Sequence, residues 1–403
     1  MDVHQVLSQY GSPVYLYDEK ILRERCQELK AMMSYPKFQV VYSAKANTNV
    51  EILKIIREEG LMVDAMSPGE MYLESLAGYI GEEITFIGNN VSEEEFCYAC
   101  ERGIYCSVDS LSQLHTLGAV NRGGEVCLRI NTEIGAGHHE KVVTGGKKAK
   151  FGIAREDLQQ AIDIAAQYDM KVTGLNHHIG SLFLDGKAYI DAAGILLELA
   201  KKVPDLRLLD FGGGFGIPYQ HNSEPRLDLK LLGQDLENLV REWIRETGKE
   251  ITIKVEPGRY VVAECGVLLG RITSVKNNYN TWFVGCDIGF NTLIRPAMYD
   301  SYHEIDIVPH SSRTYQEYEK AYLVGPICES GDILVKDRSM PVCEVNDGLI
   351  VYDVGAYGFV MASAYNSRPL PAELLRRLDG SLEIIRPAQN LEDLWHKLAE
   401  NRV

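Results

Sequence analysis

The chain has 403 residues, with 41 lysines and arginines against 57 aspartates and glutamates, so its formal net charge is −16. Such a charge repels nucleic acid phosphates and anionic membrane surfaces, which leaves a small molecule as the more plausible ligand. A chain of this length is too long for one compact core. It predicts two domains, one of which can be a large barrel.

Residues 1–20 carry neither the basic nor the apolar segment of a secretory signal, and no later stretch is apolar over about 18 residues. We therefore expect a cytoplasmic protein with no membrane partner. The nine cysteines are scattered, and their odd number predicts reduced thiols. Cys97 and Cys100 form a lone CxxC, which is more typical of incidental packing than of a metal site, so no metal is expected.

Between residues 38 and 259, short apolar runs rich in β-branched residues alternate with amphipathic helical stretches. This alternation is typical of β/α units on a parallel sheet. Eight strands close a TIM barrel, so we predict an α/β TIM barrel over residues 22–262. The eight predicted strands are FQVVYSAK, LMVDAMS, EITFIG, YCSVD, EVCLRIN, KVTGLNHHIG, RLLDFGGG and ITIKVEPGR.

After residue 262 the pattern changes to strand-rich segments such as GVLLGRITSV, TWFVGCDIG and GLIVYDVGAYG, with KNNYN as a hairpin turn. No comparable run of helices accompanies them. We predict a second, all-β domain formed by residues 1–21 and 263–403.

Polar and glycine-rich residues follow several predicted barrel strands, at the face where TIM barrels carry their active sites. Lys45 ends the first strand, where partial desolvation would suit its amine to Schiff-base chemistry, although a solvated lysine is the commoner case. The Gly212–Gly214 run is either a tight turn or a phosphate cradle. In VEPGRY, Glu256 could protonate a pyridine nitrogen and Arg259 could bind an anion. The alternative is that the two form a surface ion pair.

His177 and His178 are neighbours on the sixth strand, so only one of them can face the barrel interior. A lone histidine there is more often a hydrogen-bonded core residue than a ligand. Ser181 follows them and offers a hydroxyl to a phosphate.

The β domain contributes two glycine-rich patches, around Cys328 and Tyr357. Cys328 could be a general acid, although a structural cysteine is the commoner case. Arg295 and Tyr299 are four residues apart, so a helix would place both on one face, able to grip a carboxylate together. An ordinary surface pair is the alternative.

These motifs occur together and in one order: PVYLYDE, YSAKAN, HIGS, GGGFG, EPGR, RPAMYDSYH, GPICESGD, GAYGF and YNSRP. Together they make the sequence resemble the diaminopimelate decarboxylase family, which is related to the ornithine decarboxylases. The resemblance spans nearly the whole chain. It implies an alanine-racemase-like barrel, pyridoxal 5'-phosphate as cofactor, and decarboxylation of meso-diaminopimelate to L-lysine.

The resemblance also implies a role for each residue of the cofactor site. Lys45 would carry the cofactor, Glu256 would pair with its pyridine nitrogen, and His178 would stack on its ring and share in catalysis. The phosphate would be held by Ser181, the Gly212–Gly214 turn, Arg259 and Tyr357. Asp64 and Gly258 would complete the cofactor site.

The remaining roles concern the substrate and the partner subunit. Cys328 would return a proton to the α-carbon, and it would enter the site with Tyr357 from the second subunit of a homodimer. The distal end of the substrate would be gripped by Arg259, Arg295, Tyr299, Glu329 and Tyr357.

Four positions depart from the usual family pattern, namely Asn176, Leu182, Ala364 and Leu370, and they bear on the substrate pocket. A related decarboxylase acting on lysine, ornithine or a D-amino acid is the first alternative, because it would share the fold. A racemase lacks the CESGD and RPxxY patches. A non-catalytic decarboxylase-like regulator could dispense with Lys45 or Cys328, and this chain has both.

Overall fold

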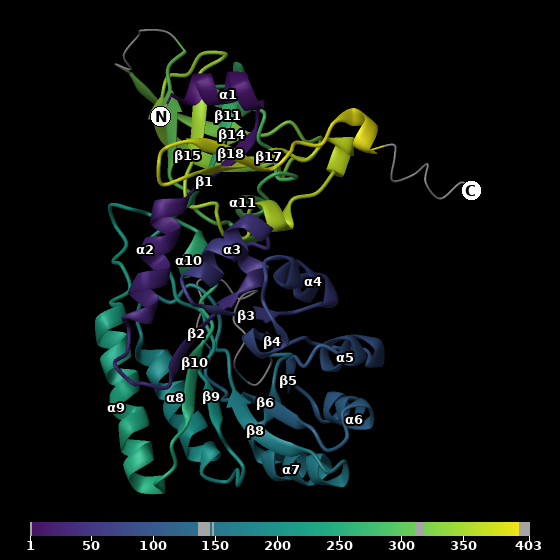
Figure 1. Cartoon of the computed structure of the whole chain (residues 1–403). Coiled ribbons are helices and arrows are strands. Elements are labelled where there is room, and N and C mark those ends of the chain that lie inside the picture. The colour runs from purple at the N-terminus through teal and green to yellow at the C-terminus, as the bar shows by residue number, and fades with distance from the viewer. Residues whose placement is uncertain (1, 136–145, 147–148, 311–316, 395–403) are drawn as a thin grey trace, which may run out of the picture. The chain divides into compact units, whose positions relative to one another are not determined.

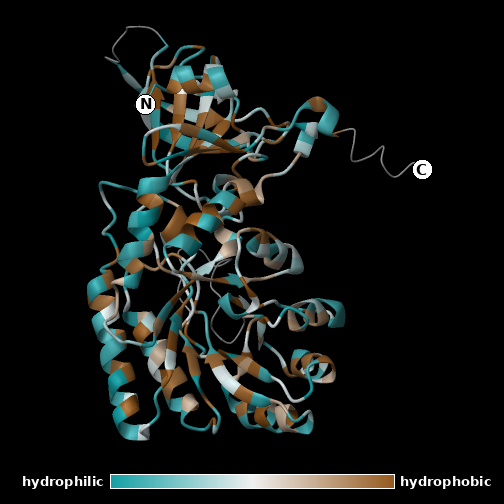
Figure 2. Cartoon of the chain, in the orientation of Figure 1, coloured by the Kyte–Doolittle hydropathy of each residue, from teal (hydrophilic) through white to brown (hydrophobic). Residues whose placement is uncertain are grey.

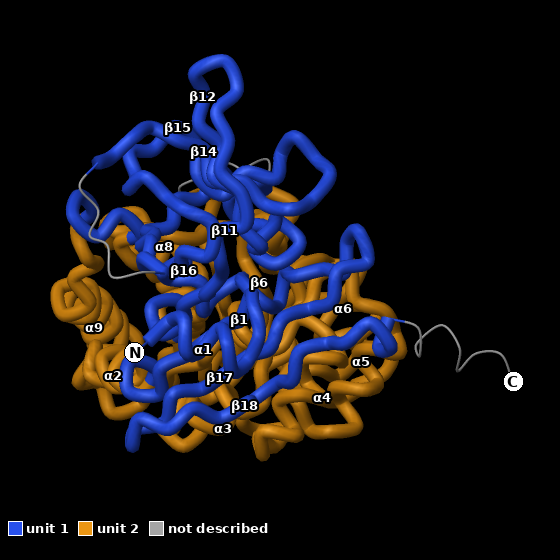
Figure 3. Tube along the Cα trace, turned by 90° about the horizontal axis from the view of Figure 1, so that it is seen from above, with its two compact units in different colours: residues 1–22, 219–224, 262–403 blue, residues 23–218, 225–261 orange. Residues whose placement is uncertain are grey.

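The computed structural model describes residues 2–135, 146, 149–310 and 317–394. It divides into two compact units (Figure 3), which we call the β unit and the barrel unit. The β unit comprises residues 1–22, 219–224 and 262–403, and the barrel unit comprises residues 23–218 and 225–261. None of the helices in the described ranges is long and apolar enough to cross a membrane.

The barrel unit is built on a closed ring of eight parallel strands (Figure 1), as the eight predicted strands required. In ring order they are β2 (Phe38–Ser43), β3 (Met62–Ala65), β4 (Ile84–Phe86), β5 (Tyr105–Val108), β6 (Glu125–Asn131), β8 (Lys171–Asn176), β9 (Leu208–Asp210) and β10 (Thr252–Val255). β10 pairs with β2 and closes the ring. A two-residue strand, β7 (Ile153–Ala154), pairs with β6 outside it.

In the described part of the chain, seven α-helices connect these eight strands. They are α3 (Val50–Glu58), α4 (Pro68–Leu76), α5 (Glu93–Cys100), α6 (Leu111–Val120), α7 (Leu158–Gln167), α8 (Lys187–Ala200) and α9 (Leu229–Thr247). α2 (Glu19–Lys30) precedes β2, and the short α10 (Arg259–Val262) follows β10.

Side-chain caps fix where several of these helices begin. Ser67 accepts a hydrogen bond from the N–H of Glu70, directly before Pro68 at the first turn of α4. Ser92 and Glu95 form a reciprocal capping box at the start of α5. Each cap lies soon after a strand, which keeps the connections at the carboxyl ends of the strands short.

The barrel strands are buried along almost their whole length, as expected for parallel strands covered by helices on one side and packed inside the barrel on the other. In β8 only the first residue is exposed. Figure 2 shows the hydrophobic colour concentrated on the barrel strands, while α9 carries hydrophilic colour over much of its surface.

The β unit holds one sheet whose strands come from both ends of the chain. Its path runs β15 (Ile333–Pro341), β14 (Tyr318–Val324), β12 (Thr281–Cys286), β11 (Gly266–Asn278), β1 (Val14–Asp18), β17 (Ala372–Arg376) and β18 (Leu382–Arg386). β16 (Gly348–Val351) pairs with β11, and β13 (Ile305–Val308) pairs with β16. This unit also contains helices that the all-β prediction lacked, among them α1 (Val3–Tyr10) and α11 (Arg295–Tyr299).

The predicted KNNYN hairpin turn is present between β11 and β12. Tyr279 and Asn280 have φ values of 52° and 64°, the positive angles that a tight two-residue hairpin turn requires. In contrast, the periodicity did not anticipate that residues 219–224, which follow β9, belong to the β unit. There, Tyr219 packs edge-on against His303 at 5.2 Å, and His221 Nε2 lies 2.7 Å from the Asp353 carboxylate.

Candidate active site

Lys45 lies just beyond the carboxyl end of β2. The strand ends at Ser43, two residues earlier than predicted, and Lys45 occupies the 3-10 turn Ala44–Ala46 that follows. A Cβ added to Gly258 would lie 3.0 Å from Cβ of Ser43 and 3.1 Å from Cβ of Ala46. The EPGR segment after β10 therefore packs directly on the turn that carries Lys45.

Buried carboxyl groups surround the Lys45 amine. Asp64, at the end of β3, is fully buried and accepts a hydrogen bond from the Ser43 hydroxyl at 3.0 Å. Burial raises the pKa of Asp64 to about 7, and the positive charge of Lys45 opposes this rise. Burial likewise raises the pKa of Glu70, and Lys45 again opposes it. The ammonium group thus favours the charged form of acids that burial would otherwise neutralise.

Glu256 and Asp210 form a second acidic pair at the ends of β10 and β9. Burial raises the pKa of Glu256 well above its usual range, the negative charge of Asp210 raises it further, and the two side chains are hydrogen-bonded. Asp210 Oδ1 also accepts the N–H of Gly212 at 2.8 Å. Two buried carboxyl groups in contact share a proton more readily than both ionise.

Two buried carboxylate atoms, on acids that feel the charge of Lys45, have no hydrogen-bond partner among the described residues. They are Oε1 of Glu256 and Oδ2 of Asp64. Buried polar atoms in proteins nearly always have a partner, so these two oxygens suit a ligand that brings an N–H or a positive charge.

His178 is placed by the backbone of Gly213, whose N–H donates to His178 Nδ1 at 3.1 Å. Burial lowers the pKa of His178 well below its usual range, and the charge of Lys45 lowers it further. The ring is therefore neutral at pH 7 and carries its proton on Nε2. His177 faces away, in an aromatic core beside Tyr189 and Phe211. It is buried in the core, but neither of its ring nitrogens has a hydrogen-bond partner among the described residues, so it is not the hydrogen-bonded core histidine that the sequence predicts as the common case.

The Gly212–Gly214 run brings strand ends together. A Cβ on Gly213 would lie 1.9 Å from the Glu256 carbonyl oxygen, and one on Gly212 would lie 2.2 Å from that of His177. The N–H groups of Gly212 and Gly213 already bind Asp210 and His178. Close backbone packing is thus enough to require glycine at these two positions.

An arginine and a serine lie close together beyond the ends of β10 and β8. Arg259, at the start of α10, is 6 % exposed, and its Nη2 donates to the Ser181 hydroxyl at 3.0 Å. A guanidinium group and a hydroxyl side by side can bind phosphate or carboxylate oxygens. Leu182, one of the departures from the family pattern, follows with φ of 68°, a left-handed conformation that costs a leucine about 1–2 kcal/mol.

Two charged barrel residues near the site were not singled out in the sequence. Arg129 on β6 and Lys254 on β10 are both nearly buried, and each lies within the electrostatic influence of Asp210 and Glu256. Lys254 Nζ donates to the Thr85 hydroxyl at 3.3 Å. The sequence feature that could have identified them is a charged residue inside an otherwise apolar strand, in EVCLRIN and ITIKVEP.

The other predicted residues belong to the β unit. Arg295 and Tyr299 lie on a helix, α11, which is the condition under which their spacing places both on one face. Arg295 is 2 % exposed, its Nη1 lies 2.8 Å from Nε2 of His303, and its guanidinium group lies 4.6 Å from the ring centre of Tyr219. Tyr357 is half-buried, with φ of 57°.

Cys328 and Glu329 lie on an exposed loop of the β unit. Both are held by residues that the sequence did not single out. The side chain of Asn366 contacts the N–H and the thiol of Cys328, and the Tyr365 hydroxyl donates to Glu329 at 2.8 Å. The structure thus gives one cluster in each unit, around Lys45 and around Cys328.

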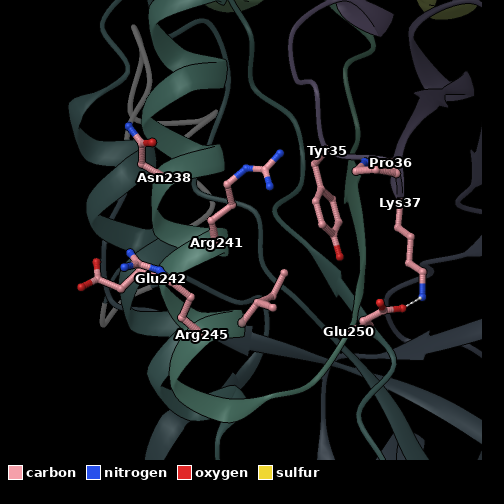
Figure 4. A pocket seen from close by; sticks show the side chains of 9 residues that line it. Tyr35, Pro36, Lys37, Asn238, Arg241, Glu242, Arg245 and Glu250 are labelled. Carbon is pink, nitrogen blue, oxygen red and sulfur yellow. Dashed lines mark hydrogen bonds and ion pairs between the residues drawn. The ribbon is translucent and has the colours of Figure 1, made fainter.

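A separate groove of about 630 Å³ lies at the opposite, amino-terminal end of the barrel strands, between α9 and the segment before β2 (Figure 4). Its charges are largely paired within the protein. Lys37 binds Glu250 at 2.6 Å, and Arg241 Nε donates to Glu237 at 2.8 Å. No predicted site residue lines this groove.

Comparison with known proteins identifies relatives along the full length of the chain. Residues 19–263 match the family described as pyridoxal-dependent decarboxylase, pyridoxal binding domain. A diaminopimelate decarboxylase of Methanothermobacter thermautotrophicus is 38% identical over 403 residues, which cover 98% of this chain and 93% of that protein.

Comparison with solved structures also identifies relatives that cover nearly the whole chain. The diaminopimelate decarboxylase of Helicobacter pylori, solved with L-lysine, is 32% identical with a TM-score of 0.91, covering 99% of this chain and 100% of that one. A lysine/ornithine decarboxylase of Vibrio vulnificus, solved with cadaverine, shares the fold at 20% identity and a TM-score of 0.80, covering 93% and 95% of the two chains.

Proposed function

This chain belongs to the diaminopimelate decarboxylases, the pyridoxal-dependent carboxy-lyases that convert diaminopimelate to lysine and carbon dioxide, and from this premise we propose how its own residues do so. The observation that carries the proposal is the pair of partnerless buried oxygens beside Lys45, on Asp64 and Glu256. They suit a cationic, nitrogen-containing ring held next to a lysine.

The residues of the barrel unit fit pyridoxal 5'-phosphate. Lys45 would hold it covalently, and Oε1 of Glu256 would accept its ring N–H, with Asp210 fixing the Glu256 carboxyl group. A cationic ring nitrogen there would favour the ionised carboxylate and so oppose the effect of burial. When bound, the cofactor supplies an electron sink for the pair of electrons that departing carbon dioxide leaves behind.

His178 and an anion site would complete the cofactor pocket. A neutral His178 ring, held by Gly213, can stack on an aromatic ring without bringing a second positive charge beside Lys45. Ser181 and Arg259, with Gly214 and Tyr357, would hold the phosphate, since the N–H groups of Gly212 and Gly213 already bind Asp210 and His178. Asp64, bonded to Ser43, would keep the Lys45 amine in place, and Gly258 would permit the close packing at its turn.

Cys328 would act as the acid that completes the reaction. Its Sγ–H bond breaks, a C–H bond forms at the α-carbon of the substrate, and the electron pair stays on sulfur. Glu329 on the same loop would bind the distal ammonium group of the substrate. Arg295 and Tyr299, with Arg259 and Tyr357, would bind its carboxylates, and the contacts of Arg295 with His303 and Tyr219 would hold its guanidinium group rigid.

The substrate in this proposal is meso-diaminopimelate, whose distal end carries both a carboxylate and an ammonium group. A substrate panel tests it. Purified enzyme with cofactor should release carbon dioxide from meso-diaminopimelate and form L-lysine, with little activity on lysine, ornithine or D-lysine. A strong preference for ornithine or D-lysine would overturn the substrate and leave the cofactor chemistry intact.

We also propose a homodimer with shared active sites. The Cys328–Glu329 loop is exposed in the single chain, whereas proton transfer to carbon is best protected where water is excluded. Mixing equal amounts of Lys45→Ala and Cys328→Ala subunits should restore about a quarter of wild-type activity, because half the dimers are mixed and each has one intact site. No recovery would mean that Cys328 serves its own chain.

A cytoplasmic location completes the proposal. All nine cysteines are free thiols, which is typical of a reducing compartment.

A further inference from the structure

The exposed loop that carries Cys328 is clamped by one side chain. Asn366 Oδ1 accepts the backbone N–H of Cys328 at 3.2 Å, and Asn366 Nδ2 lies 3.3 Å from Cys328 Sγ. The same amide therefore contacts the main chain and the thiol of one residue. Neither contact is explained by burial, because both residues are exposed.

The backbone contact fixes the orientation of the Asn366 amide group. A peptide N–H can only donate, so the amide atom that faces it must be the oxygen. The amide nitrogen must then face Cys328 Sγ, where it donates a hydrogen bond to sulfur. The thiol proton is thereby kept out of the direction of Asn366.

The segment that carries Asn366 is itself held in place. Asn366 and Ser367 have φ values of 56° and 52°, a left-handed conformation that asparagine tolerates better than most residues. On one side, the Tyr365 ring stacks on Phe290 at 5.8 Å and its hydroxyl binds Glu329. On the other side, Arg368 Nη2 lies 3.5 Å from the Pro326 carbonyl oxygen.

We propose that Asn366 is a positioning residue that aims the Cys328 thiol and stabilises the thiolate left after proton transfer. This inference rests on the proposed role of Cys328 as the acid. When the S–H bond breaks and the C–H bond forms, the electron pair remains on Sγ, next to the amide N–H that already points at it. A hydrogen bond to a charged acceptor is stronger than one to a neutral acceptor, so the contact favours the product side of the transfer.

Two substitutions separate this role from a purely structural one. Asn366→Asp keeps an oxygen for the Cys328 N–H and tolerates the left-handed backbone, but an ionised carboxylate cannot donate to sulfur. Asn366→Ala removes both contacts without adding charge. If Asn366 only holds the loop, the Cys328 thiol of the Asp variant should be as reactive as that of wild type. If Asn366 aims the thiol, the thiol should be less reactive in both variants.

The measurement is alkylation of Cys328 by iodoacetamide in the cofactor-loaded enzyme at pH 8, followed by peptide mass spectrometry, because the thiolate is the reactive form. We expect alkylation to slow about tenfold in both variants, with a similar fall in kcat and little change in KM. Tyr365→Phe is the matched control, since it removes the neighbouring bond to Glu329 and should leave the alkylation rate of Cys328 unchanged.

A wild-type rate of Cys328 alkylation in Asn366→Asp would overturn the inference. Slower alkylation in Asn366→Asp but not in Asn366→Ala would also overturn it, because the added negative charge alone would then explain the effect. Cys328→Ala distinguishes a failure of the role proposed for Cys328 from a failure of the role proposed for Asn366. If that variant retained full activity, the proposed role of Cys328 would fail. If it is inactive while the Asn366 variants are normal, only the role of Asn366 fails.

Discussion

In the barrel unit the glycine turns of the candidate site are fixed by close backbone packing, whereas in the β unit Cys328 is fixed by one side chain from 38 residues further along the chain. In the barrel unit, the carbonyl groups of His177 and Glu256, beyond the ends of β8 and β10, lie against glycines that admit no Cβ. Around Cys328, an amide, a phenol and a stacked ring hold an exposed loop.

This difference indicates different tolerance to change. A backbone-built site fails as a whole when the packing fails, because its parts share the same strand ends. A site held by side chains can lose one bond and keep the rest. Substitutions in the two units should therefore differ in kind: loss of fold or of all chemistry in the first, and, except at Cys328 itself, graded kinetic changes in the second.

The largest expected effect is that of Lys45→Ala in the barrel unit. Turnover should fall below detection, because the covalent attachment point of the cofactor is lost. The yellow absorbance band that shifts on borohydride treatment should also disappear. Lys54→Ala is the matched control, since Lys54 forms only a partly exposed pair with Glu51 and should change stability by less than about 1 kcal/mol. A normal band in Lys45→Ala would move the attachment point elsewhere.

Gly213→Ala tests the backbone construction directly. Its Cβ would meet the Glu256 carbonyl oxygen at 1.9 Å, so the strand ends must separate, and we expect a loss of more than about 4 kcal/mol of unfolding free energy. Denaturant unfolding measures it. In contrast, Gly194→Ala in α8 meets no atom within 4 Å and should stabilise the helix by about 0.5–1 kcal/mol. Equal effects of the two changes would contradict the packing argument.

Glu74→Gln probes the acids behind the Lys45 site. Glu74 is fully buried, its carboxyl oxygens have no partner among the described residues, and burial raises its pKa to about 9. The folded state therefore binds this proton more tightly than the unfolded state, so stability is lost as the pH rises from about 4.5 towards 9. By pH 7 the loss is on the order of 3 kcal/mol.

The Gln variant mimics the protonated acid and should escape this loss. Its Tm should match that of wild type near pH 4.5 and exceed it increasingly above pH 6. Glu82→Gln, at an exposed position, is the control. Parallel Tm curves for wild type and Glu74→Gln would show that Glu74 is charged in the folded protein.

The smallest expected effect is that of Tyr365→Phe in the β unit. Loss of the hydrogen bond to Glu329 should weaken substrate binding and raise KM a few-fold. A change of this size corresponds to the free energy of one hydrogen bond, about 1 kcal/mol. Global unfolding should be unchanged, because the Tyr365 side chain is exposed and the substitution keeps its ring. A large fall in Tm would show that this loop is part of the folding core after all.

Much of the barrel could be predicted from the sequence because its information is local. Each of its features is visible in a short stretch of sequence: the eight apolar runs, the glycine run and the lysine after the first strand. Because the carboxyl ends of the barrel strands meet at one face, these features are expected to lie together. The main error was at a boundary: β2 ends at Ser43, and Lys45 follows in a 3-10 turn.

What could not be predicted depends on contacts between distant segments. Nothing in the local pattern of YNSRP shows that Asn366 reaches Cys328, because the contact exists only when two exposed loops meet. The assignment of residues 219–224 to the β unit has the same cause, since His221 finds its partner in Asp353, 132 residues away. Such contacts depend on tertiary structure, which periodicity does not encode.

The N-terminal strand β1 has a consequence for synthesis on the ribosome. It lies between β11 and β17, and its last residue, Asp18, pairs with Arg376, 358 residues later. At about 5–20 residues per second, β1 must wait roughly 20–70 s for that neighbour, while the whole barrel emerges in between. The barrel unit can thus fold during translation, whereas the sheet of the β unit closes only when the chain is nearly finished.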